Sequence, residues 1–500
     1  MNTILYIRNL QQIRSNLFRQ QPGWILIVIT LFTVSCGKNV LDLYPETYLT
    51  QGVFYTNQAQ LEQSVNDAYR QLARIYDAGG IPDIYGELSS DNVYIKAASG
   101  ANSWPQDINQ HIIRADNGRL EQAWNTAYNA IYIINNALYQ LENAPVEFTD
   151  QSKKQRLRGE AKAIRALIYY NLTQAWGDVP FPLTVVSPEE SYSYLREDRQ
   201  AIYAQLVTDL TGSKAVLPDA YTGAEVGRIT KYGASAILAR IYIAQNDAAN
   251  ATRELKEIID SNRFSLDGNG DGTTNIQDYA HLFKQDTRNA KESVLEVQYL
   301  AGQNQVNSTH QTEYAPWDFA FHLPGSNITF RGSGLNTPTE DLINEYEATD
   351  QRKSLSLNEG FHDLQTGNFI DYPYTLKFFD ADHLYPGQNV EVFRYADILL
   401  LYAELAQDAD YLNQVRARAG LPLFGTASYP SEKYPTLSLA IEHERRVELA
   451  FEFHRFFDLV RTGRAVIVLS AKGVNVTDKD LLFPIPQAVI DVNPAIVQNP

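Results

Sequence analysis

The segment from Asp267 to Asp278 (DGNGDGTTNIQD) carries oxygen-bearing side chains at regular intervals. Counted from its first residue, they fall at positions 1, 3, 5, 9 and 12 and belong to Asp267, Asn269, Asp271, Asn275 and Asp278. Gly272 takes the sixth position, where such a loop turns sharply, and Thr273 would offer its backbone carbonyl at the seventh. This is the spacing of an EF-hand-like calcium loop, with Asp in place of the usual Glu at position 12. We therefore predict a structural Ca²⁺ site, and the alternative is a plain turn rich in Gly, Asn and Asp.

The single cysteine, Cys36, follows a segment that has the features of an export signal. Residues 1–35 contain Arg8, Arg14 and Arg19, no acidic residue, and an apolar run from Trp24 to Val34. That run is too short to span a bilayer, and its pattern is typical of a secretory signal peptide. Thr33-Val34-Ser35-Cys36 resembles the lipobox of a bacterial lipoprotein, in which the cysteine is acylated. We expect a signal peptide over 1–35 and lipidation at Cys36; the alternative is an ordinary signal peptide followed by a free thiol.

The common catalytic motifs are missing from the sequence. His443-Glu444-Arg445-Arg446-Val447 lacks the second histidine of HExxH, and the chain has no GxSxG or GxxxxGK[ST] motif and no CxxC pair. A glycosidase needs only two suitably spaced carboxylates, and 59 acidic residues are too many to test by inspection. We predict that the protein is not an enzyme, with a surface glycoside hydrolase as the alternative.

The charge of the chain argues against a nucleic-acid partner. The full sequence has 42 Lys and Arg against 59 Asp and Glu, a net charge of −17. Removing residues 1–35 takes away three arginines and gives 39 − 59 = −20. Such a surface repels phosphate backbones.

Helical periodicity dominates the sequence. In 57–77, Leu61, Val65, Leu72 and Ile75 fall on one stripe behind a candidate N-cap at Asn57. Similar patterns predict further helices over 121–143, 151–176, 198–216, 228–246, 248–261, 392–407, 409–419, 436–453 and 454–462. Short turns pair these helices, which favours a solenoid of stacked helical hairpins.

The pattern changes between residues 264 and 392, where Gly, Asn, Pro and aromatic residues crowd together and short runs such as SVLEVQY predict strands. Long aromatic-rich loops in a compact protein usually carry function. The tail from 481 to 500 holds Pro484, Pro486, Pro494 and Pro500, so we expect it to lie extended across the helices.

Four segments together resemble the SusD/RagB family of outer-membrane lipoproteins. They are RGEAKAIRALIYYNLTQAWGDVPF (158–181), FRYADILLLYAELA (393–406), IEHERRVELAFEFHRFFDLVRTGR (441–464) and FPIPQAVIDVNPAIVQNP (483–500). The chain departs from the family at Phe453, where Gly is common, and in the short turn from Gln407 to Asp410.

The resemblance implies an all-α, TPR-like solenoid of helical hairpins with a long loop-rich insertion and short strands. It also implies a single domain over 36–500, made of a helical part (36–263), a loop-rich ligand-binding region (264–392) and C-terminal helices with an extended tail (393–500).

The resemblance implies a function as well. The family captures nutrients at the cell surface, most often glycans, and passes them to a SusC-like TonB-dependent outer-membrane transporter. We therefore expect an oligosaccharide-binding lipoprotein anchored in the outer membrane, with a peptide-binding member of the family as the alternative. By position, Trp104, Tyr314, Trp317 and Phe319 resemble the rings on which family members stack glycans, while Trp124 and Trp176 lie in helical motifs and should be core.

Overall fold

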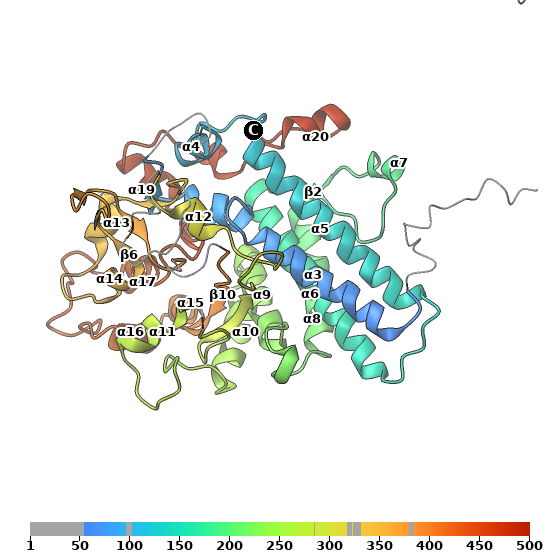
Figure 1. Cartoon of the computed structure of the whole chain (residues 1–500), viewed down its shortest axis with the longest axis horizontal. Coiled ribbons are helices and arrows are strands. Elements are labelled where there is room, and N and C mark those ends of the chain that lie inside the picture. Colours follow the sequence, from blue (N-terminus) through green and yellow to red (C-terminus); the bar gives the residue numbers. More distant parts are fainter. Residues whose placement is uncertain (1–54, 97–102, 285, 318–322, 324–331, 380–384) are drawn as a thin grey trace, which may run out of the picture. The chain divides into compact units, whose positions relative to one another are not determined.

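The computed structural model describes residues 55–96, 103–284, 286–317, 323, 332–379 and 385–500, and Tyr55–Pro500 form one compact unit. The boundary at Cys36 lies outside the described residues. Helices dominate the unit, as predicted (Figure 1). Among the described residues, no helix is both long enough and apolar enough to cross a bilayer.

The first half of the unit is a series of neighbouring helices. In chain order they are α3 (Gln58–Ile75), α5 (Gly118–Asn143), α6 (Gln151–Trp176), α8 (Arg199–Lys214), α9 (Lys231–Ala244) and α10 (Ala248–Asp260). Each packs against the next one. Asn57 caps α3 through its side chain, as predicted, and Gly177 ends α6 at a φ of 72° that suits glycine.

The helical series continues after a long insertion. α10 packs against α15 (Tyr395–Ala406), which contacts α16 (Ala409–Arg418) and α17 (Leu437–Glu448). The loop-rich segment therefore leaves the solenoid after one helix and returns to the neighbouring one. Its elements are α11 (Ile276–Leu282), β4 (Ser293–Val297), α12 (His310–Tyr314), β5 (Thr337–Pro338), α13 (Glu340–Glu345), α14 (Arg352–Ser356), β6 (Leu357–Asn358), β7 (Phe361–His362), β8 (Phe369–Ile370), β9 (Tyr374–Thr375) and β10 (Val390–Arg394).

Short elements complete the unit. They are a π-helix (Pro82–Leu88), β1 (Val93–Tyr94), α4 (Ser103–Asn109), β2 (Val179–Pro180), α7 (Pro188–Ser191), β3 (Arg196–Glu197), α18 (Arg455–Arg461), α19 (Ala465–Ala471) and α20 (Gln487–Val492), with 3₁₀ turns at Gly223–Glu225 and Asp478–Leu481. The strands of the described segments form antiparallel pairs: β1–β5, β2–β3, β4–β10, β6–β9 and β7–β8.

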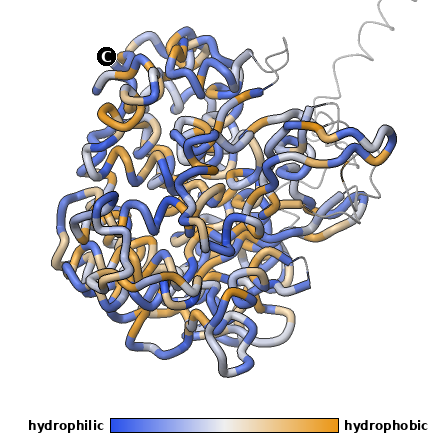
Figure 2. The backbone as a smooth tube through the Cα atoms, turned by 90° about the vertical axis from the view of Figure 1, so that its left-hand side faces the viewer, coloured by the Kyte–Doolittle hydropathy of each residue, from blue (hydrophilic) through white to orange (hydrophobic). Residues whose placement is uncertain are grey.

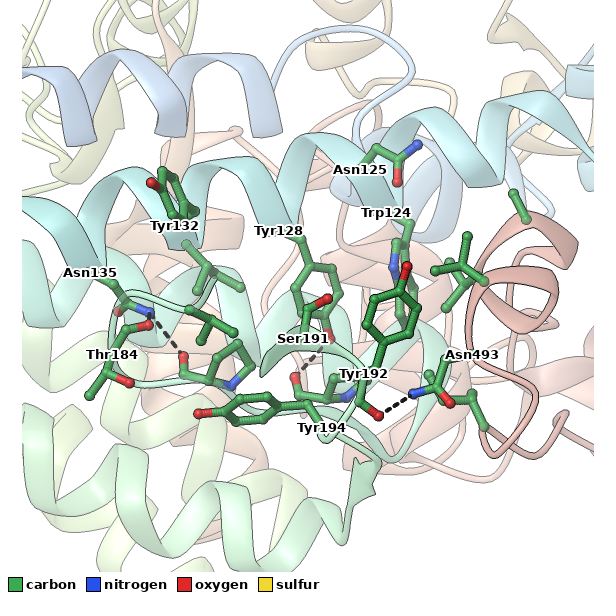
Figure 3. A pocket seen from close by; sticks show the side chains of 18 residues that line it. Trp124, Asn125, Tyr128, Tyr132, Asn135, Thr184, Ser191, Tyr192, Tyr194 and Asn493 are labelled. Atoms are coloured by element: carbon green, nitrogen blue, oxygen red, sulfur yellow. Dashed lines mark hydrogen bonds between the residues drawn. The ribbon is translucent and has the colours of Figure 1, made fainter. Parts of the chain in front are cut away.

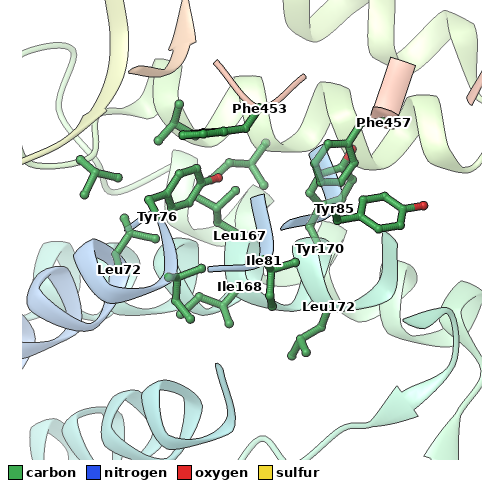
Figure 4. Close-up of a cluster of buried hydrophobic side chains, with 14 of the residues drawn as sticks. Leu72, Tyr76, Ile81, Tyr85, Leu167, Ile168, Tyr170, Leu172, Phe453 and Phe457 are labelled. Atoms are coloured by element: carbon green, nitrogen blue, oxygen red, sulfur yellow. The ribbon is translucent and has the colours of Figure 1, made fainter. Parts of the chain in front are cut away.

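An apolar core runs between the helices, and polar and apolar residues alternate along them (Figure 2). Trp124 and Trp176 are buried, as predicted, and their rings meet edge to face at 5.2 Å. Tyr76, Tyr85 and Phe457 join aliphatic side chains of α6 in one part of this core (Figure 4). The core thus links the first helices to the C-terminal ones.

Buried ion pairs tie the insertion to α17. Arg394, which ends β10, lies 2.7 Å from Glu292, 2.5 Å from Glu448 and 2.6 Å from Glu452. Arg352 in α14 lies 2.7 Å from the same Glu448. Such pairs add little stability over apolar packing, but loss of one partner costs about 3–5 kcal/mol because a buried charge is left alone. These ion pairs therefore determine how the insertion packs against α17.

Some of the predicted boundaries are wrong. The helix expected over 392–407 begins only at Tyr395, because Val390–Arg394 form β10. The helix expected over 436–453 ends at Glu448, since Phe451 and Phe453 have φ values of 67° and 66°. The tail was expected to be extended throughout, but residues Gln487–Val492 form α20 directly after Pro486, because proline at a helix start loses no hydrogen bond.

Candidate functional site

The structure brings two of the predicted aromatic segments to neighbouring strands. β1 pairs with β5, with Tyr94 opposite Thr337. Trp104 follows β1 in α4, and Trp317 lies before β5, where it forms a bridge with Gly332. We call Trp104, Trp317 and Tyr372, which packs in one apolar cluster with Trp317, the aromatic loop face.

Trp104 is both fixed and accessible. Its ring packs against Gly118 so closely that a Cβ there would overlap it. Its carbonyl accepts a 3.0 Å hydrogen bond from Nδ2 of Asn117, whose Oδ1 in turn caps α5 at Arg119. The side chain is nevertheless 47% exposed. A half-exposed indole that is held in place by its neighbours can offer a flat ring face without first being ordered.

Trp317 is half-buried and packs at the edge of a small apolar cluster that includes Ala315, Tyr372 and Tyr374. Its Cβ lies against Gly334, which has a φ of 67° and leaves no room for a side chain below the Tyr372 hydroxyl. Lys96 lies over the Tyr372 ring, 4.8 Å from its centroid, and donates to the carbonyl of Asp371. A cation and several rings therefore share this face.

An ion pair connects the two halves of the face. Arg119, in the first turn of α5, lies 3.8 Å from Glu313 in α12. Burial raises the pKa of Glu313, and Arg119 only partly offsets this effect. The start of α5, which supports Trp104, is thus attached to the segment that leads to Trp317.

For two of the four predicted aromatics, the described residues show no exposed ring. Tyr314 is buried at 2% exposure, and its hydroxyl donates to Oδ1 of Asp83 at 2.7 Å. The same oxygen accepts from Nδ2 of Asn336 at 2.8 Å. Its role as a ligand-stacking ring is therefore corrected to that of a core residue, because its ring is buried and its hydroxyl is bound to the buried Asp83. Phe319 lies outside the described residues.

The predicted calcium loop is a compact turn that leads into α11. The carboxylate of Asp267 accepts the amides of Gly270, Asp271 and Gly272 at 2.9, 3.1 and 2.9 Å. Buried Asp278 accepts the amides of Asn269 and Asn275 and closes a capping box. These five bonds wrap the loop around its first and last residues.

The other loop oxygens are more open. Asp271 is exposed, and hydrogen bonds from the Thr273 hydroxyl and amide lower its pKa. Asn275 uses its Oδ1 to accept the amide of Gln277. Over the described residues, no three His, Cys, Asp or Glu side chains converge as a metal-binding group. The oxygen atoms of the loop side chains are ligands that Ca²⁺ prefers, and Ca²⁺ binding stays a prediction.

A cleft that the sequence analysis missed lies along α5. It has a volume of about 490 Å³, and its walls come from α5, the segment from Pro180 to Tyr194, and α20 (Figure 3). Tyr128, Tyr132, Tyr192 and Tyr194 face it, together with asparagine, proline and aliphatic side chains. The two tyrosines of the SYSYL run at 191–195 were the sequence signal that could have found it.

Sequence profiles of two known families match this chain. The profile described as "SusD family" matches residues 372–500, and the one described as "Starch-binding associating with outer membrane" matches 41–243. Two curated proteins are similar over most of their length. A SusD-like protein of Formosa agariphila is 24% identical over 95% of this chain and 97% of its own, and one of Bacteroides ovatus is 22% identical over 89% and 83%.

Solved structures share the fold. A protein titled "Laminarin binding SusD-like protein" superposes with a TM-score of 0.72 and 26% identity, covering 89% of this chain and 99% of that one. Surface glycan-binding protein A from Bacteroides thetaiotaomicron, in complex with laminarihexaose, gives a TM-score of 0.73 at 21% identity and covers 89% and 100%. The predicted TPR-like helical fold with a loop-rich insertion is confirmed.

Proposed function

Because the chain belongs to the SusD/RagB family, we propose that it captures oligosaccharides at the cell surface and passes them to a SusC-like TonB-dependent outer-membrane transporter. The similar structures are titled laminarin-binding and surface glycan-binding proteins, which supports a glycan ligand. These are names of binding proteins, in agreement with the prediction that this chain is not an enzyme. The family description "associating with outer membrane" supports outer-membrane association.

The observation that carries the ligand class is the half-exposed Trp104 on a rigid support in α4, which contacts β1, while Trp317 precedes β5, the partner strand of β1. The C–H face of a sugar ring packs against an indole largely as an apolar contact, so binding should depend little on salt. Deleting either ring should remove that contact and leave the fold intact.

The test is calorimetry on the full-length protein in detergent, with a ligand first identified on an array of glycans and peptides. Trp104→Ala and Trp317→Ala should each weaken binding about 10-fold or more. Tyr139→Ala is the matched control, because this tyrosine is 54% exposed and lies about 30 Å along α5 from Gly118, the support of Trp104. Unchanged affinity in both tryptophan variants would place the ligand elsewhere.

The same array separates the alternatives. Binding of peptides alone would favour the peptide-binding alternative, and turnover of a bound glycan would favour the glycoside hydrolase. Co-purification with a TonB-dependent transporter from outer membranes tests the transfer step, since a protein that works as part of a transport complex should be recovered with it.

A further inference from the structure

We propose that the cleft between α5, the 180–194 segment and α20 is a second binding subsite, and that it takes a neutral oligosaccharide. This inference rests on the proposed glycan-binding function. It adds a site to which none of the ligand-binding aromatics predicted from the sequence contributes. It is carried by the charge, the rings and the free polar groups of the cleft lining (Figure 3).

The lining carries no charge. None of its 18 residues is Asp, Glu, Lys, Arg or His, although one fifth of the chain is Asp, Glu, Lys or Arg. A charged ligand would lose its hydration here and find no counter-charge, which is unfavourable. The cleft therefore selects for a neutral molecule.

The inner wall is rigid because its polar groups already have partners. Nδ2 of Asn135 donates to the carbonyls of Pro182 and Thr184 at 3.1 and 2.9 Å. The Tyr128 hydroxyl donates to the carbonyl of Pro180 at 2.8 Å, and Nδ2 of Asn493 donates to that of Tyr192 at 3.1 Å. These bonds hold the 180–194 segment against α5 on one side and α20 on the other.

The rim, in contrast, offers rings and unused hydrogen-bonding groups. Tyr132 and Tyr192 are 44% and 56% exposed. Their hydroxyls, and the amide of exposed Asn125, make no hydrogen bond within the described part of the chain. Ring faces beside free hydroxyl and amide groups match a ligand that has apolar C–H faces and many hydroxyls, which is a neutral sugar.

The position of the cleft agrees with a role beside the aromatic loop face. Gly118, which supports Trp104, and Asn125 and Tyr132, which line the cleft, are spaced i, i+7 and i+14 on α5 and so share one stripe. The cleft thus begins about 10 Å along the helix from the support of Trp104. A long glycan that reaches the loop face also passes near the cleft.

The experiment uses full-length protein in detergent and calorimetry with neutral gluco-, manno- and galacto-hexasaccharides, laminarihexaose among them. The parent is the double variant Trp104→Ala/Trp317→Ala, which removes the loop face. At least one hexasaccharide should still bind it. Adding Tyr132→Ala and Tyr192→Ala should then weaken that residual binding at least 10-fold, while Tyr385→Ala, at an exposed tyrosine of the insertion that does not line the cleft, should not.

A charged probe tests the preference for a neutral ligand, and the melting temperature tests whether the variants stay folded. An oligosaccharide of uronic acids of the same length should bind the double variant more weakly than the neutral chains. Both tyrosines are about half exposed and their hydroxyls hold no partner among the described residues, so their removal should change the melting temperature little. Absence of residual binding in the double variant, or residual binding that survives loss of both tyrosines, would overturn the subsite while the proposed function stands. Absence of glycan binding by the unaltered protein would overturn the proposed function and this subsite with it.

Discussion

His443 in α17 is surrounded by two carboxylates and a tyrosine ring. Its Nδ1 donates to Oε1 of Glu345 at 2.7 Å, and its Nε2 lies 3.4 Å from Oε1 of Glu347. The ring stacks on Tyr434 at 3.9 Å. Burial alone would lower the pKa of His443, but the hydrogen bond to Glu345 and the nearby carboxylate of Glu347 outweigh burial and raise the pKa above 6.5. Burial likewise opposes ionisation of Glu345, yet His443 and nearby cations lower its pKa to about 2.

This arrangement predicts a pH-dependent stability. The raised pKa of His443 means that the folded state holds a proton which the unfolded state has released above about pH 6.5. The stabilisation is therefore complete below that pH and is lost as pH rises through the folded pKa. Urea unfolding at pH 6 and pH 8.5 should show a fall in the free energy of unfolding, and His443→Gln should reduce that fall. Equal pH dependence in both proteins would contradict the assignment.

The calcium loop gives a second prediction at the residue scale. A cation that binds only the folded state raises the melting temperature by mass action. We expect Ca²⁺ to raise the melting temperature relative to chelator, and Asp271→Ala to abolish the rise, because Asp271 is the exposed carboxylate of the loop. Asp116→Ala, an exposed carboxylate outside the loop, should keep it. Identical curves with Ca²⁺ and with chelator would rule out the site.

At the scale of elements, the helices could be predicted from periodicity, but some of their ends could not. The helix predicted over 151–176 is α6 with the same bounds, because its caps lie next to it in the sequence. α17 ends early because Oε1 and Oε2 of Glu87 accept the amides of Phe451 and Phe453, each at 3.2 Å. Glu87 is more than 360 residues away from Phe451, so the residues around α17 give no indication of this hydrogen bond.

The end of α15 offers a test of local backbone strain. Gln407 follows the helix in the left-handed region, with φ 54° and ψ 43°, and its side chain is exposed. Glycine adopts this conformation without the steric cost that other residues have there. Gln407→Gly should therefore raise the free energy of unfolding by about 0.5–1 kcal/mol. Gln407→Ala keeps the strain and should give no gain; a loss of stability in the glycine variant would contradict the argument.

At the scale of the molecule, long-range ion pairs could not be predicted. Glu442 and Arg446 are four residues apart on α17, a spacing at which oppositely charged side chains can pair. In the structure Glu442 lies 2.7 Å from Arg464, and Arg446 lies 2.6 Å from Asp341 of the insertion. Spacing on a helix shows which side chains can meet, whereas the folded insertion decides which of them do. The cleft along α5 could not be predicted either, because the fold brings together its three wall segments, which are separate in the sequence.

A lipid anchor at Cys36 would hold the whole protein at the membrane. Cys36 lies outside the described residues, and over the described ones no helix could serve as a bilayer span. Stable anchoring through lipid takes at least two acyl chains. If Cys36 carries them, Cys36→Ser should move the protein from the outer-membrane fraction to the soluble one, with glycan binding intact because the site lies on separate residues. Fractionation with immunoblotting measures this change. A Cys36→Ser protein that stays in salt-washed outer membranes would show that another feature of the chain holds it there.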